Sequence, residues 1–148
     1  MDKNAFLIEL SESERTDFGR VDFETQNEVQ RVFSAIWELE SQVNNGGFDQ
    51  YFRNSDSDII AHAPTALRAI GASSCAGIVE RAIEVISPLQ TTQEGRYGAL
   101  DELGDEAQDR LAALDSEFYK YPDNLTELLF GFVSRHPEAF GSFPGGRA

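Results

Sequence analysis

The densest group of side chains with binding chemistry in this chain is a run of carboxylates in its C-terminal third. Nine Asp and Glu residues fall between Asp101 and Glu127, where only Arg110 and Lys120 oppose them. Carboxylates accept hydrogen bonds from Arg and Lys much as phosphates do, so this run predicts a surface that binds a basic protein. The candidate partner-binding residues are Asp101, Glu102, Asp105, Glu106, Asp109, Asp115 and Glu117.

The spacing of these acids predicts that they form rows. Asp101, Asp105 and Asp109 are four residues apart, so on one helix they align with a rise of about 6 Å per step. Glu102 and Glu106 would form a parallel row beside them. Such a ridge resembles a nucleic-acid strand in charge, and the distance between its acids is similar in magnitude to the distance between neighbouring phosphates. The plainer interpretation is a solvated helix face whose acids only keep the protein soluble.

Other chemistry finds little support in the sequence. His62 and His136 are far apart in the sequence, and neither is accompanied by enough other ligands to complete a metal site. The stretch 54–58 resembles the start of a calcium loop, but Ile59 and Thr65 replace the Gly and Glu that such a loop requires. No Gly-rich phosphate loop or nucleophile–His motif is present. We therefore expect no catalytic residue, no metal and no cofactor, and a protein that is not an enzyme.

Apolar residues that recur every three or four positions predict helices to carry these groups. The sequence indicates an all-α fold, a single compact bundle of about five to seven helices, with 1–148 as one domain. We expect residues 1–23 to be loosely ordered apart from a short helix near 5–10, and 141–148 to be a flexible tail. The main predicted helices cover about 24–43, 59–70, 78–86, 100–121 and 125–133.

Composition limits the classes of function. The 148 residues carry a formal net charge of −14, with 26 acidic against 12 basic residues, and 41% are hydrophobic. This charge repels nucleic acid and anionic lipid and attracts basic protein surfaces. The charges in the middle of the chain nearly cancel, because Arg53, Arg68, Arg81 and Arg96 oppose its acids.

The single cysteine, Cys75, is expected in the core. The N-terminus is not a signal peptide and no long apolar run exists, so we expect a cytoplasmic protein with no membrane contact.

One segment is distinctive. Residues 38–54 read ELESQVNNGGFDQYFRN, with the motif Asn45, Gly46, Gly47, Phe48, Gln50, Tyr51, Phe52 and Asn54. Together with the order of the following helices, it resembles a family of small bacterial helical proteins whose best-known member is a DNA mimic. The resemblance covers about residues 25–135. It implies an all-α fold and, for the DNA mimic, a homodimer whose acidic surface occupies the DNA-binding face of a transcription regulator.

The motif itself reads as structural rather than as the mimic surface. Asn and Gly favour a helix end at 44–47, and Phe48, Tyr51 and Phe52 have the spacing of an inward-facing helical cluster. We expect these aromatic side chains in the core rather than around a ligand. Gln50 and Asn54 could form a polar pocket edge or cap a helix.

The leading functional interpretation is an acidic DNA mimic that binds a basic nucleic-acid-binding protein, such as a transcription regulator, without contacting nucleic acid itself. One alternative is an immunity-type inhibitor of a toxin or other cationic enzyme. A second is an enzyme or small-ligand domain centred on residues 45–54, which requires Asn45, Gln50 and Tyr51 to converge on a polar pocket. A third is a soluble domain whose acids have no partner.

Overall fold

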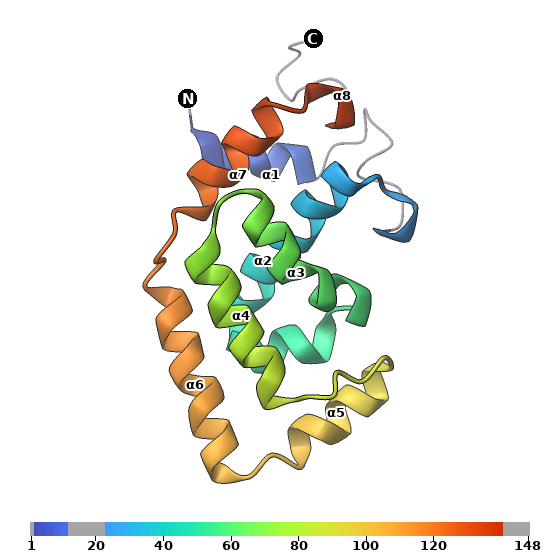
Figure 1. The fold of residues 1–148 in the computed structure, drawn as a ribbon, viewed down its shortest axis with the longest axis vertical. Coiled ribbons are helices and arrows are strands. Elements are labelled where there is room, and N and C mark those ends of the chain that lie inside the picture. The colour runs from blue at the N-terminus through green and yellow to red at the C-terminus, as the bar shows by residue number, and fades with distance from the viewer. Residues whose placement is uncertain (1, 12–22, 141–148) are drawn as a thin grey trace.

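The protein is described by a computed structural model that places residues 2–11 and 23–140. These residues form eight α-helices and one short 3₁₀ helix without a strand, so the all-α prediction is confirmed (Figure 1). The helices are α1 (Lys3–Ser11), η2 (Phe23–Thr25), α2 (Glu28–Asn54), α3 (Ser57–Ala69), α4 (Ser73–Val85), α5 (Gln93–Asp101), α6 (Asp105–Tyr119), α7 (Leu125–Ser134) and α8 (Pro137–Phe140).

Helix α2 is the centre of the fold and packs against α3, α5, α6 and α8. It begins at a capping box, in which the Asn27 side chain accepts a hydrogen bond from the Gln30 backbone N–H and the Gln30 side chain accepts one from the Asn27 N–H. Apolar residues at helical spacing then bury one face of α2, and the buried side chains of all the long helices join in one hydrophobic core. Burial of this stripe, rather than helix propensity, holds α2 in place.

Two antiparallel neighbours, α4 and α6, run side by side, and α5, which joins them in the chain, lies beside them at the same end of the molecule (Figure 1). Helices α1 and α7 pack together at the opposite end of the molecule. The chain segment that joins α5 to α6 therefore lies at one extremity of the protein, where side chains can reach a partner.

The short helix predicted near 5–10 is confirmed as α1, which covers Lys3–Ser11 and is a few residues longer than expected. Its Leu7 and Leu10 side chains are buried. Residues 12–22 and the predicted tail at 141–148 lie outside the described residues.

The predicted helix at 100–121 is wrong as a single element. It is divided into α5 and α6 by a turn at residues 102–104. Gly104 takes the N-cap position of α6, and Asp105 and Glu106 occupy its first turn, where the helix dipole favours anions. This division, together with the short helix α8, brings the number of helices above the predicted five to seven.

Candidate protein-binding surface

The division of α5 from α6 changes the arrangement of the predicted acidic rows. Asp101 is the last residue of α5 and Asp105 is the first residue of α6. Asp101, Asp105 and Asp109 therefore do not form one helical row, and Glu102 and Glu106 do not form a second one. Only Asp105 and Asp109 keep their four-residue helical relation.

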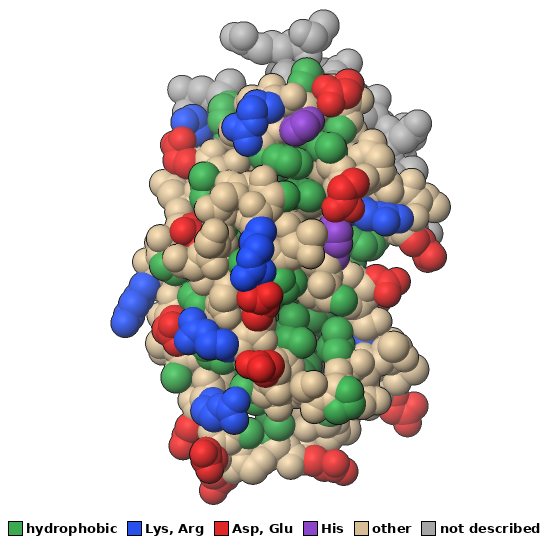
Figure 2. Space-filling view, viewed as in Figure 1, with side chains coloured by type: hydrophobic (Ala, Val, Ile, Leu, Met, Phe, Trp, Pro, Cys, Tyr) green, Lys and Arg blue, Asp and Glu red, His purple; other side chains and the backbone are tan. Residues whose placement is uncertain are grey.

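Four of the seven predicted acids remain available to a partner. Glu102, Asp105, Glu106 and Asp109 are exposed, and no described Lys, Arg or His forms an ion pair with them. We call these four residues the acidic face. Figure 2 shows acidic side chains at the end of the molecule where α5 meets α6. Arg110 is the single Lys or Arg within α6, so the acidic face is largely uncompensated.

The other three predicted acids have partners within the protein. The Arg53 guanidinium donates to Asp101 over 2.9 Å, and the Arg81 guanidinium donates to Glu117 over 3.2 and 3.3 Å. Asp115 is half-buried and accepts a 2.8 Å hydrogen bond from the backbone N–H of Phe48. Each of these three carboxylates has at least one oxygen engaged within the protein, so we do not count them in the acidic face.

Asp115 stabilises the break that the Asn-Gly-Gly sequence makes in α2. Gly46 has φ −159° and ψ 24°, and Gly47 has φ 73° and ψ −174°, so a kink at these two residues separates two helical parts of α2. The N–H of Phe48 at the start of the second part would lack an intrahelical acceptor, and Asp115 supplies one from α6. The Tyr119 hydroxyl donates to the Val43 carbonyl over 2.8 Å on the other side of the break.

The motif behaves as a core anchor, as its spacing predicts. Phe48, Tyr51 and Phe52 are fully buried and contact one another through their rings. Asn45 is exposed, while Gln50 and Asn54 both donate to the Gln42 side-chain carbonyl at 2.9 and 3.2 Å. The convergence of Asn45, Gln50 and Tyr51 that a ligand site would need is not found.

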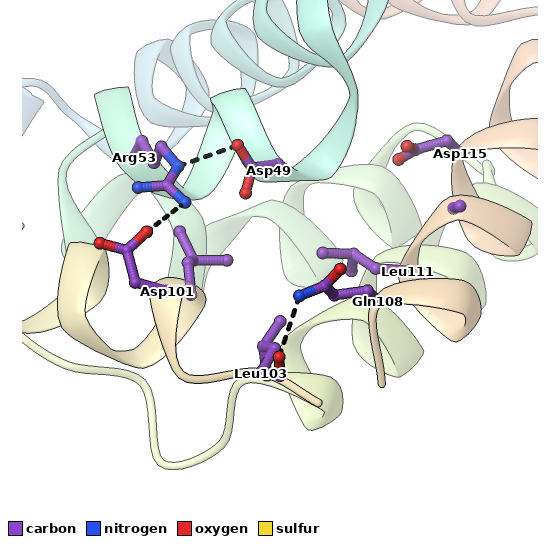
Figure 3. Close-up of a pocket in the computed structure, with 9 residues that line it drawn as sticks. Asp49, Arg53, Asp101, Leu103, Gln108, Leu111 and Asp115 are labelled. Carbon is purple, nitrogen blue, oxygen red and sulfur yellow. Dashed lines mark hydrogen bonds and ion pairs between the residues drawn. The ribbon is translucent and has the colours of Figure 1, made fainter. Parts of the chain in front are cut away.

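Beside the acidic face lies a cavity of about 440 Å³ between α2, α5 and α6, which we call the junction cavity (Figure 3). Asp49, Arg53 and Asp101 form one wall and Asp115 lies on the opposite wall. The remaining lining residues are Leu100, Leu103, Gln108, Leu111 and Ala112. Arg53 donates to Asp49 and to Asp101 at 2.9 Å each.

Burial affects the protonation of two groups near these elements. Burial raises the pKa of Asp115 above its ordinary value, while its hydrogen bond from Phe48 lowers it and the charge of Asp49 raises it further. Burial also raises the pKa of the Cys75 thiol to about 12. Cys75 is fully buried, which confirms its predicted place in the core.

The described residues contain no group of three His, Cys, Asp or Glu side chains placed to hold a metal.

The sequence indicated Arg96 only as one of the charges that balance the acids in the middle of the chain, and its structural role was missed. Arg96 is 3% exposed, and its guanidinium donates to the backbone carbonyls of Phe52, Ser55 and Gln90 at 2.8 to 2.9 Å. Because Arg96 lies in α5, these hydrogen bonds hold α5 against the end of α2 and against the segment that precedes α5. No local pattern marks it, because all three acceptors are main-chain atoms. The surface around the middle of the chain consequently carries one positive charge fewer than predicted.

Comparison with known proteins gives one match. The family model of the DMP19-like proteins matches residues 24–136. No curated protein and no solved structure matches the chain. Among the described helices, none combines the length and the apolar character needed to cross a membrane.

Proposed function

Since the chain belongs to the DMP19-like family, we propose that it is a DNA mimic that occupies the DNA-binding surface of a basic nucleic-acid-binding protein, such as a transcription regulator. The observation that carries this proposal is the acidic face. Its four carboxylates are exposed at one end of the molecule without a described cationic partner.

Electrostatics explains how such a face would compete with DNA. Arg and Lys side chains that donate hydrogen bonds to phosphates can donate to carboxylates in a similar geometry. The net charge of −14 also attracts a basic surface toward the protein. The turn between α5 and α6 presents Glu102 close to the start of α6, which carries the other three acids. The surface that would mimic DNA therefore consists of the start of α6 and the turn before it, rather than a long helical ridge.

The test is capture of partners from an extract of the source cells by the immobilised full chain. In the acidic-face variant all four acids become amides: Glu102→Gln, Asp105→Asn, Glu106→Gln and Asp109→Asn. A matched control removes the same charge from α1, η2, α3 and α8: Glu9→Gln, Glu24→Gln, Asp58→Asn and Glu138→Gln. We expect wild type and control to capture a basic DNA-binding protein that mass spectrometry identifies, and the acidic-face variant to lose it.

Duplex DNA then tests the mimicry itself. DNA should displace the chain from its captured partner, because both would occupy the same surface. Simultaneous binding of DNA and chain, or equal capture by the acidic-face variant, would reject the proposal. Capture of a cationic toxin or enzyme that DNA does not displace would favour the immunity-type inhibitor instead.

The homodimer implied by the family resemblance belongs to the same proposal. Light scattering after size-exclusion chromatography should give twice the 16.4 kDa chain mass. A monomer at the concentrations used for capture would mean that one chain alone acts as the mimic.

A further inference from the structure

The junction cavity differs from the acidic face because it is concave and has both charged and apolar walls. Its volume of about 440 Å³ lies within the range of ligand sites, roughly 300–1,000 Å³. Leu103 is partly exposed and Ala112 is exposed, and both give the cavity an apolar wall that the nearly buried Leu100 and Leu111 back from behind. A purely electrostatic surface would not need such a lining.

The charged wall keeps acceptor capacity after its internal ion pairs are formed. The cavity holds three carboxylates and one guanidinium, a net charge of −2. Arg53 engages one oxygen of Asp49 and one oxygen of Asp101. The second oxygen of each carboxylate, Asp49 Oδ1 and Asp101 Oδ2, accepts no hydrogen bond from the described residues. A second cation can therefore bind beside Arg53 without displacing it.

Gln108 adds a neutral acceptor between the two walls. Its amide nitrogen donates to the Leu103 carbonyl over 2.9 Å, which fixes the side chain in place (Figure 3). Its own carbonyl oxygen accepts no hydrogen bond from a described residue. The cavity thus combines carboxylate and amide oxygens with an apolar surface.

We propose that the junction cavity anchors one arginine side chain of the basic partner. The methylene stem of an arginine would pack on the leucines, as long cationic side chains do at interfaces. Its planar guanidinium offers five donors for acceptors on more than one side, and it is less strongly hydrated than an ammonium group. This inference rests on the proposed function for the partner's class, but the ligand class follows from the cavity alone.

The experiment is an NMR titration of the ¹⁵N-labelled full chain with N-acetyl-arginine-N-methylamide. The neutral isostere N-acetyl-citrulline-N-methylamide is the control ligand. Ala112→Phe places a ring in the cavity without changing the charge, with Ala112→Leu as a smaller plug in case the larger one perturbs folding. Ala113→Phe is the matched control, because Ala113 is also exposed on α6 but does not line the cavity.

We expect arginine to shift the Gln108 side-chain amide and the backbone signals of 100–103 and 111–112, and citrulline to leave them unchanged. The plug variants should weaken binding by about tenfold or more, and Ala113→Phe by less than about twofold. Equal shifts with citrulline, unchanged binding to Ala112→Phe, or shifts centred on the separate hollow at Glu24, Asp56 and Asp58 would overturn the proposal.

The two proposals fail in different ways. Arginine binding without capture of any basic partner would refute the proposed function and leave the ligand class of the cavity intact. A captured partner whose binding Ala112→Phe leaves unchanged would refute the anchor and leave the DNA mimic intact.

Discussion

Replacing Gly47 with alanine tests whether the break in α2 is a built feature held by α6. Gly47 has φ 73° and ψ −174°, a region that glycine alone occupies readily. An added Cβ would lie 2.5 Å from Asp115 Oδ2 and 2.9 Å from its Cγ. The carboxylate would have to move, and its 2.8 Å hydrogen bond from Phe48 would be lost.

The magnitude follows from these two effects. The backbone conformation costs an alanine roughly 1–3 kcal/mol, and loss of a hydrogen bond to a charged group costs roughly 1.5–3 kcal/mol. We expect Gly47→Ala to lower the free energy of unfolding by about 2.5–6 kcal/mol, a large part of the roughly 5–15 kcal/mol typical of a domain.

Urea denaturation followed by circular dichroism measures this change. Gly77→Ala in α4 is the control, because its Cβ would meet nothing within 4 Å, and we expect it to stabilise the helix by up to about 1 kcal/mol. The double variant Gly47→Ala with Asp115→Ala should cost less than the sum of the single variants, because both remove the same hydrogen bond. If Gly47→Ala unfolds at the same urea concentration as wild type, or if the two effects are strictly additive in the double variant, then Asp115 does not hold the break in α2.

Three further outcomes follow from buried polar groups. Arg96→Met keeps the side-chain length but leaves three backbone carbonyls without their donor, so urea unfolding should show a loss of about 3 kcal/mol or more; an unchanged midpoint would mean that the guanidinium is dispensable. Cys75, buried and with its pKa raised to about 12, should react with a thiol reagent at pH 8 only after unfolding, and rapid labelling of the native protein would contradict its burial. Asp115→Asn retains an acceptor for Phe48, and its stability relative to wild type should rise as pH increases from the ordinary aspartate pKa of 3.8 through the raised folded value. The sign follows because folded wild type binds the proton more tightly than unfolded chain, so it loses stability as that proton leaves; a difference independent of pH would contradict the raised pKa.

The features that depend on neighbouring residues could be predicted from the amino-acid sequence. Apolar residues at helical spacing fixed the all-α class, because a helix must bury its apolar face wherever it lies. Asn45, Gly46 and Gly47 marked the break in α2, and Phe48 and Phe52 marked its buried face. These properties arise within a few turns of chain.

Which acids have partners within the protein follows from helix packing and could not be predicted from the sequence. Arg53 reaches Asp101 across 48 positions, Arg81 reaches Glu117 across 36, and Phe48 reaches Asp115 across 67. No spacing rule contains such pairs, because they form when separate helices pack. The break between α5 and α6 likewise depends on how the chain turns at the end of the bundle. The number of charges can therefore be counted from the sequence. Helix packing decides which carboxylates form the exposed acidic face and which pair with Arg53 or Phe48 at the junction cavity.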